Sequence, residues 1–268
     1  MSAHAFLLDH VCDDLADRLS LMQRRFGLGL DLGAHGGALS AAAMATGKVG
    51  RMVRAAPVAQ LAGATDGQAI VCDQEALPFA PQSLDLVLSA LTLQFANDLP
   101  GALLQIRQAL KPDGLFLGAM LGGRTLAELR AAFSAAEIET TGGISPRVAP
   151  FADVRDLGQL MQRAGFALPV ADAEVLRVTY PSPLALMREL KAMGASNMLT
   201  ERRRTPLRRE TLALASALYE RDYGVDGRIA ATFEIITLTG WAPHASQQQP
   251  LRPGSARASL AKALDGNS

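Results

Sequence analysis

The chain has 268 residues, 49% of them hydrophobic, which is enough for a sizeable core in one large domain or one domain with an insert. Its formal net charge is zero at pH 7, so no global basic field favours a nucleic acid partner. No apolar run reaches the roughly 18 residues that span a membrane, and the N-terminal stretch does not look like a signal peptide. The two cysteines, Cys12 and Cys72, lack metal-like spacing, so we expect a reducing, cytoplasmic compartment.

The first half of the chain alternates between strand and helix patterns. Apolar residues at helical spacing predict an amphipathic helix over 4–25, and alternating leucines predict a short strand at 28–32. A glycine turn and a helix at 38–47 follow. The later patterns predict strands at 49–53, 69–73, 84–90 and 115–120, a helix at 97–110 capped by Asn97 or Asp98, and a turn at 111–114.

The second half has a looser pattern. It predicts helices at 125–137 and 153–164, a Gly/Pro-rich loop at 140–151, a strand at 175–180, a mainly helical stretch at 182–223 and a last strand at 231–243. The organisation we expect is an N-terminal helix (1–26), a nucleotide-binding core (27–120), cap loops with a helical insert and closing strands (121–243), and a mobile tail (244–268).

Strands that alternate with helices imply βαβ units and a mostly parallel sheet. Ligands of such sheets bind outside the carboxyl ends of the strands. The glycine turn, Asp73, Ser89 and the loop from Leu121 should therefore lie around one crevice.

The stretch "GLGLDLGAHGG" (27–37) reads as a strand that enters a glycine turn. Such a turn lets the backbone approach a ligand, although a tight turn without a ligand has the same pattern. Asp31 could accept hydrogen bonds from a cationic amine or could stabilise the turn itself. His35 stands where such turns usually carry a glycine.

The second strand lacks the acidic residue that nucleotide folds usually place at its end to hold ribose hydroxyls. No Asp or Glu occurs between Gly47 and Thr65, and Arg51 and Arg54 stand there instead. An arginine there could hold the 2′-phosphate of NADP. A short-chain reductase would also carry a tyrosine followed four residues later by lysine, and no tyrosine of this chain is so followed.

The most specific stretch is "VCDQEALPFAPQSLDLVLSALTLQFANDLPGALLQIRQALKPDGLFLGAM" (71–120). Its order of strand, acidic residue, "LPF", "LDLVLS", capped helix, "LKPDG" and strand resembles the class I S-adenosylmethionine-dependent methyltransferases, in their "methyltransferase 11" branch. The resemblance implies an α/β, Rossmann-like fold of seven strands, mostly parallel, with helices on both faces. It also implies a helical cap insert from 121–150 and 182–229.

The resemblance implies S-adenosylmethionine as the cofactor. The positions that match the family's binding motifs are Asp31, Gly33, Ala34, Gly37, Asp73, Gln74, Ser89 and Leu91. Of these, Asp73 matches the residue that contacts adenine. The resemblance assigns no catalytic residue and no metal ligand.

Segments beyond Met120, among them "GGRTLAELR", "PFADVRDLGQLMQRAGF" and "MRELKAMGASN", resemble the mitochondrial and alphaproteobacterial complex I assembly-factor proteins. That family is associated with hydroxylating an arginine on the iron–sulfur, quinone-site subunit of complex I. The resemblance implies a protein substrate, an iron–sulfur subunit as partner and a bacterial cytoplasm. The family's "DLGCGRG" is here "DLGAHGG", and its acidic residue after the second strand is replaced near Ala56, so we expect a weakened cofactor site.

Three functions remain open. The chain could be an enzyme that uses S-adenosylmethionine on a protein, a non-catalytic protein that chaperones a partner subunit, or a small-molecule methyltransferase. A substrate arginine would need a carboxylate, for which Glu128 and Asp153 are candidates, with crevice walls from "GGRTLAELR", "GGISPRVAPF" and "MGASN". The charge run at 201–210 is either a solvated helix entry or a site for an acidic partner or a phosphate. The histidines, at positions 4, 10, 35 and 244, lack the local spacing of iron ligands.

Overall fold

A computed structural model describes residues 5–62 and 68–247 of the chain. Its main helices are α1 (Phe6–Leu21), α2 (Ala38–Ala45), α3 (Ala59–Ala62), α4 (Leu99–Ala109), α5 (Ala127–Thr141), α6 (Val154–Arg163), α7 (Pro183–Ala192) and α8 (Arg209–Tyr223). Its strands are β1 (Phe26–Leu32), β2 (Val49–Ala56), β3 (Gln68–Val71), β4 (Leu84–Ala90), β5 (Leu110–Leu121), β6 (Ala167–Tyr180), β7 (Gly224–Val225) and β8 (Arg228–Trp241).

The strands form one sheet in the order β3-β2-β1-β4-β5-β8-β6, and the two-residue β7 pairs with β8. Neighbouring strands from β3 to β5 run parallel, while β8 is antiparallel to both β5 and β6. The predicted α/β fold with a mostly parallel sheet is therefore confirmed. The short β7 is an addition that the sequence pattern did not indicate.

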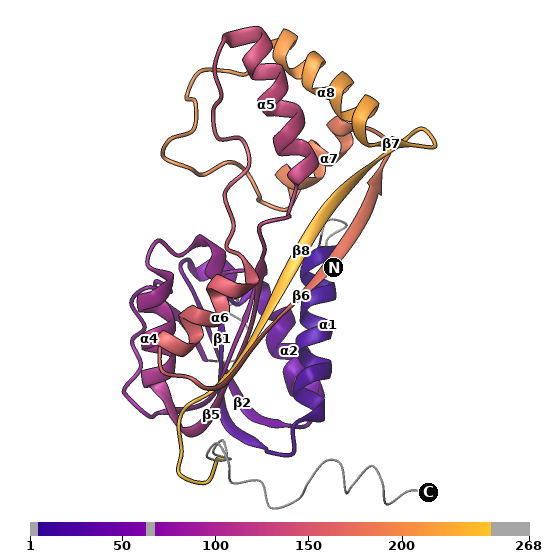
Figure 1. Ribbon diagram of the computed structural model, residues 1–268. Coiled ribbons are helices and arrows are strands. Elements are labelled where there is room, and N and C mark those ends of the chain that lie inside the picture. Colours follow the sequence, from indigo (N-terminus) through magenta and orange to yellow (C-terminus); the bar gives the residue numbers. More distant parts are fainter. Residues whose placement is uncertain (1–4, 63–67, 248–268) are drawn as a thin grey trace, which may run out of the picture.

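Helices cover both faces of the sheet, with α1 and α2 on one side and α4 and α6 on the other (Figure 1). Leu15, Leu19 and Leu39 of the first pair belong to one buried cluster, and Leu103 and Met161 of the second pair belong to another. Strand residues fill both clusters because their side chains alternate between the two faces of the sheet. The predicted helix at 4–25 is present with the shorter bounds of α1.

A long hairpin of β6 and β8 connects the sheet to a helical cap of α5, α7 and α8 (Figure 1). The pairing runs from Ala167↔Trp241 at the sheet to Tyr180↔Ile229 near the cap. Tyr219 of α8 is fully buried, and its hydroxyl donates to the carbonyl of Ala230 (2.8 Å). The core of the cap is thus continuous with one core of the sheet.

Two element boundaries differ from the predicted ones because strand pairing overrides the local pattern. Residues 111–114, predicted as a turn between elements, lie inside β5 as a bulge, where the register jumps from Leu84↔Leu110 to Leu86↔Leu115. Asp113 turns the chain there with φ +61°. Strand β6 begins at residue 167, well before the predicted 175, since β8 supplies a partner along its whole length.

The stretch at 182–223, predicted as mainly helical, consists of α7 and α8 separated by a non-helical segment at 193–208. Within the described residues, no helix combines the length and apolar character needed to cross a membrane. Of the predicted tail at 244–268, the structure describes 244–247, and the remainder lies outside the described residues.

Candidate functional site

The carboxyl ends of the parallel strands bring the predicted site segments to one edge of the sheet. The backbone N–H of Gly33 donates to Ala55 O at the end of β2, at 2.8 Å. With its amide oriented to satisfy both neighbours, Gln74 donates to Thr92 O (3.3 Å) and accepts from Ala96 N (3.0 Å). The glycine turn, the 73–74 stretch and the segment after β4 therefore lie together at the carboxyl edge of the sheet, where the switch-point rule predicts a ligand crevice.

The glycine turn packs directly against Thr92. Gly33 has φ +109°, and a Cβ atom there would lie 1.9 Å from Thr92 Oγ1. Gly37 also has a positive φ, +93°, and forms the N-terminal end of α2. Glycine suits this turn for two reasons: the backbone has positive φ, and the segment after β4 packs closely against it.

Replacing Gly33 by alanine should destabilise the fold by about 1–3 kcal/mol more than replacing Gly36 by alanine does. Both glycines have positive φ, but a Cβ at Gly36 would meet nothing within 4 Å, whereas at Gly33 it would overlap Thr92. Both variants carry a side chain at positive φ, +109° at Gly33 and +76° at Gly36, and only the Gly33 variant adds the overlap with Thr92, so urea unfolding should show the larger loss there. Equal stabilities would contradict this packing of the turn.

Asp31 anchors the helix that follows the turn. Its carboxylate is 1% exposed and accepts from the backbone N–H (3.0 Å) and the hydroxyl (2.7 Å) of Ser40. Burial raises the pKa of Asp31, and the hydrogen bonds from Ser40 only partly oppose this rise. These contacts favour the turn-stabilising role of Asp31 over direct contact with a ligand amine.

His35 of the glycine turn contacts the segment that follows β4. Its backbone has φ +37°, and its Nε2 lies 2.9 Å from Thr92 Oγ1. Because Thr92 Oγ1 itself donates to Ala90 O (3.1 Å), it accepts from a proton on Nε2. Burial lowers the pKa of the imidazole, which favours its neutral form. The ring therefore links the glycine turn to the end of β4, where the resemblance would place the methyl donor.

The end of β2 is closed and apolar. Ala56 is 1% exposed and forms a small buried cluster with Ala34 and Ala62. This cluster stands where the family places its ribose-binding carboxylate. No charge-assisted hydrogen bond to a ribose is available from Ala56 itself.

The remaining predicted residues differ in their exposure. Ser89 is fully buried, and its hydroxyl donates to Leu32 O (3.0 Å), tying β4 to β1. Leu91 has φ +49°, and its N–H donates to Ala119 O (2.8 Å). Asp73 is exposed, and its Oδ1 accepts from the N–H of Glu75 (2.9 Å). Asp73 is therefore open to solvent, whereas His35 and Ala56 replace the glycine and the carboxylate of the family pattern.

Thr92 is the residue of this crevice that sequence reasoning missed. It is 6% exposed and contacts both the glycine turn and His35. Its place directly after Ser89 and Leu91, which match the family's binding motifs, was the available signal in the sequence.

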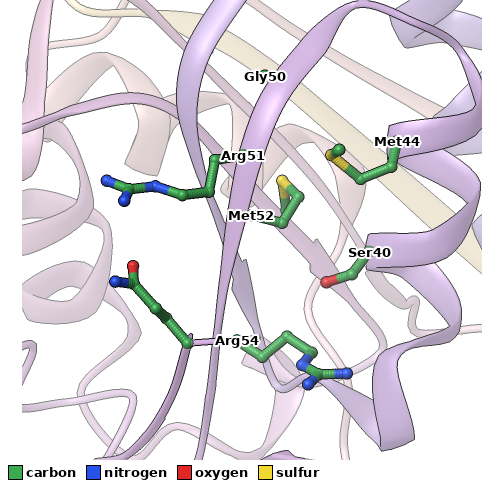
Figure 2. Close-up of a pocket in the computed structure, with 7 residues that line it drawn as sticks. Ser40, Met44, Gly50, Arg51, Met52 and Arg54 are labelled. Carbon is green, nitrogen blue, oxygen red and sulfur yellow. The ribbon is translucent and has the colours of Figure 1, made fainter. Parts of the chain in front are cut away.

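A cavity of about 440 Å³ lies at the edge of β2, lined by Ser40, Met44, Gly50, Arg51, Met52, Arg54 and Gln68. Figure 2 shows Arg51 and Arg54 directed to opposite sides of the strand. A Cβ at Gly37 would lie 2.8 Å from Arg54 Nη1, so this guanidinium packs under the glycine turn. The two arginines therefore do not converge on one phosphate, which counts against the NADP interpretation.

The cap holds a second cavity of about 440 Å³, called here the cap cavity. It lies between α5 and the loop that follows α5, and its lining comprises Gly123, Arg130, Ser134, Ile144, Ser145, Pro146, Arg147, Val148, Pro150 and Phe151. Asn197, at the end of the predicted wall segment 193–197, donates from Nδ2 to Pro146 O (2.7 Å). This hydrogen bond joins that segment to the loop after α5. The three segments predicted as crevice walls thus meet in space.

Neither carboxylate predicted for a substrate arginine lines the cap cavity. Glu128 accepts from the hydroxyl and the backbone N–H of Thr232 on β8. Asp153 caps α6 by accepting from Arg155 N (2.8 Å). Over residues 5–62 and 68–247, no group of three His, Cys, Asp or Glu side chains could hold a metal ion.

A family model described as a methyltransferase domain matches residues 30–118. The mitochondrial arginine-hydroxylase NDUFAF5 of Homo sapiens is 40% identical over 262 residues, which cover 95% of this chain and 75% of the human protein. This chain belongs to the same methyltransferase-fold family as NDUFAF5. The Danio rerio member is 47% identical over 195 residues, and the match covers 72% of this chain but only 60% of that protein's length.

The family's wider relatives include O-methyltransferases. The malonyl-[acyl-carrier protein] O-methyltransferase of Laribacter hongkongensis is 36% identical over 93% of this chain and 87% of its own length. Among solved structures, the YcgJ protein of Bacillus subtilis covers 86% of this chain and 98% of its own, with a TM-score of 0.59 and 15% identity. Phosphoethanolamine N-methyltransferase 2 of Haemonchus contortus, solved with S-adenosyl-L-methionine, has a TM-score of 0.50 at 18% identity and covers 86% of this chain and 52% of its own. These structural likenesses show the fold.

Proposed function

We propose that this chain acts on a polypeptide during the assembly of respiratory complex I, on a methyltransferase scaffold whose cofactor site is weakened. The similarity of this chain to arginine-hydroxylase NDUFAF5, which extends over the cap as well as the sheet, supports a polypeptide substrate. The observation that carries the proposal is the cap cavity itself, which two of the predicted wall segments line and which the third joins through the Asn197–Pro146 hydrogen bond. A binding surface formed mainly by a loop suits a polypeptide partner.

The cofactor under this proposal is S-adenosylmethionine, bound weakly, which when bound supplies an electrophilic methyl group. Asp73 would hold its adenosine end. At the glycine turn His35 bonds to Thr92 in place of a glycine, and Ala56 offers no carboxylate to the ribose. We expect the iron–sulfur, quinone-site subunit of complex I as the partner and the bacterial cytoplasm as the location.

Two other functions have specific support. The neutral His35 ring in the crevice favours a protein that binds and chaperones its partner without catalysis. The 36% identity to malonyl-[acyl-carrier protein] O-methyltransferase favours methylation of a carboxyl group.

A capture experiment separates these alternatives. The full chain should be immobilised and presented with the complex I subunits of the same cell, and bound subunits should be identified and checked by mass for hydroxylation or methylation. Capture with a mass change supports the enzyme, and capture without one supports the chaperone. A chain that captures no subunit but methylates malonyl-acyl-carrier protein contradicts the proposal.

A further inference from the structure

The cap carries a cluster of arginines with few acidic partners. Arg130 and Arg147 line the cap cavity, and no carboxylate residue shares that lining. A smaller cavity of about 170 Å³ on the other side of Arg147 is lined by Arg203, Arg208, three threonines and the acidic Glu137 among others. These four arginines, called here the cap basic cluster, connect the two cavities through Arg147.

The charge of Arg130 is not paired with a carboxylate in the described part of the chain. Its guanidinium reaches only backbone carbonyls, those of Gly123, Thr125 and Ala149, at 3.4–3.5 Å. These distances are longer than ordinary N–H···O hydrogen bonds. A ligand carboxylate would form shorter, charge-assisted bonds with this guanidinium.

Arg147 is held in place by a buried acid. Glu137, 1% exposed, accepts from Arg147 Nε at 2.8 Å, and the Arg147 guanidinium lies 5.8 Å from the ring centre of Phe133. This pair fixes the loop between the two cavities and neutralises the charge of Arg147. The attraction for a ligand therefore comes from the other three arginines of the cluster.

Arg203 and Arg208 are exposed at the rim of the smaller cavity. Arg203 Nε donates to Thr205 Oγ1 (3.1 Å), and Arg208 Nη1 donates to Thr140 O (3.4 Å). Both acceptors are neutral, so each cation keeps its charge for a partner. Ile144, 62% exposed, adds an apolar surface to the wall of the cap cavity.

We propose that the cap basic cluster binds an acidic segment of the partner polypeptide. Carboxylates complement three guanidiniums that no carboxylate of residues 5–62 and 68–247 pairs, whereas a cationic side chain would be repelled from the cap cavity. A partner arginine to be modified would thus lie outside the cap cavity, with acidic neighbours in its chain docked on the cap. This inference rests on the proposed function, because it assigns the chemistry of the polypeptide that the cap receives.

The test uses the full chain and fluorescence anisotropy with three short labelled peptides of equal length, in which alanine alternates with Glu, Gln or Lys. We expect the Glu peptide to bind, the Gln and Lys peptides to bind at least tenfold more weakly, and added salt to weaken the Glu peptide. Arg130→Gln and Arg208→Gln should each weaken the Glu peptide about fivefold, as expected for partly exposed charge pairs. The matched control is Arg163→Gln, an exposed arginine on α6 outside the cap.

Two further arms keep the test decisive. Arg130→Lys keeps the charge and should retain most of the binding, which separates a charge effect from a loosened cap; thermal melting checks the fold of each variant. A labelled oligothymidylate that binds more tightly than the Glu peptide would overturn the proposal in favour of nucleic acid, and equal binding of all three peptides would also overturn it. The cluster and the proposed function can also fail separately. If complex I subunits are captured but the Arg130→Gln and Arg208→Gln variants capture them equally well, the cluster is not the docking site and the proposed function stands. If the Glu peptide binds and no subunit is captured, the acidic site stands and the proposed function fails.

Discussion

Replacing Glu137 by alanine should lower the free energy of unfolding by about 2–4 kcal/mol. Glu137 is 1% exposed and accepts from the backbone N–H of Ser145 (2.7 Å), the Ser145 hydroxyl (2.8 Å) and Arg147. The alanine variant leaves the Arg147 guanidinium and the Ser145 N–H without their acceptor. Breaking a buried ion pair typically costs roughly 3–5 kcal/mol, and the 19% exposure of the Arg147 side chain reduces that figure here.

Urea unfolding at neutral pH measures this loss, and hydrogen exchange should place it at the loop 142–151. The matched control is Glu139→Ala, an exposed glutamate on the same helix, which should change stability by less than about 0.5 kcal/mol. A Glu137→Ala variant as stable as this control would show that the ion pair does not hold the loop.

The contribution of Glu137 should also depend on pH in a defined direction. Burial by itself would raise the pKa of the Glu137 carboxyl, but the Ser145 N–H and the Arg147 guanidinium outweigh it and lower the pKa. A carboxyl whose folded pKa lies below its unfolded value, about 4.3, stabilises the fold above that pH and loses this effect as pH falls through the folded pKa. The stability difference between the natural chain and Glu137→Ala should therefore shrink below about pH 4.

Restoring the family pattern at the glycine turn should tighten S-adenosylmethionine binding. We expect the natural chain to bind it no better than roughly tens of micromolar, and His35→Gly with Ala56→Asp to gain about 1.5–3 kcal/mol, or tenfold or more. Glycine removes the ring that reaches Thr92 and relieves a backbone with φ +37°. Aspartate at position 56 would supply charge-assisted bonds to the ribose.

The structure also predicts that the two substitutions differ when made alone. Ala56 packs against Ala34 and Ala62, so Ala56→Asp alone places a carboxylate in an apolar cluster while His35 still bonds to Thr92. We expect His35→Gly alone to improve binding and Ala56→Asp alone to improve nothing. Calorimetric titration of all four chains measures this, and the demethylated product serves as a second ligand. Nanomolar affinity of the natural chain, or no gain in the double variant, would show that the site is not weakened as described.

Local pattern alone determined the order of strands and helices in the core. The predicted strand at 84–90 coincides with β4, and Asp98 caps α4 by accepting from Gly101 N (2.9 Å). Such elements can be predicted because buried strands are runs of apolar residues, and because a helix cap depends on residue types within a few positions of the helix end. The glycine turn was likewise evident, since positive φ is seldom adopted by residues with a side chain.

Tertiary contacts set the strand ends and side-chain partners that the local sequence pattern does not predict. The start of β6 at Ala167 depends on its pairing with β8, far away in the chain. The contact of His35 with Thr92 joins residues 57 positions apart, and Glu137 meets Arg147 only because the loop folds back onto α5. A side chain's partner is set by the packing of elements, which a local pattern does not contain. For that reason the sequence indicated an altered glycine turn, while only the folded chain showed that His35 contacts Thr92.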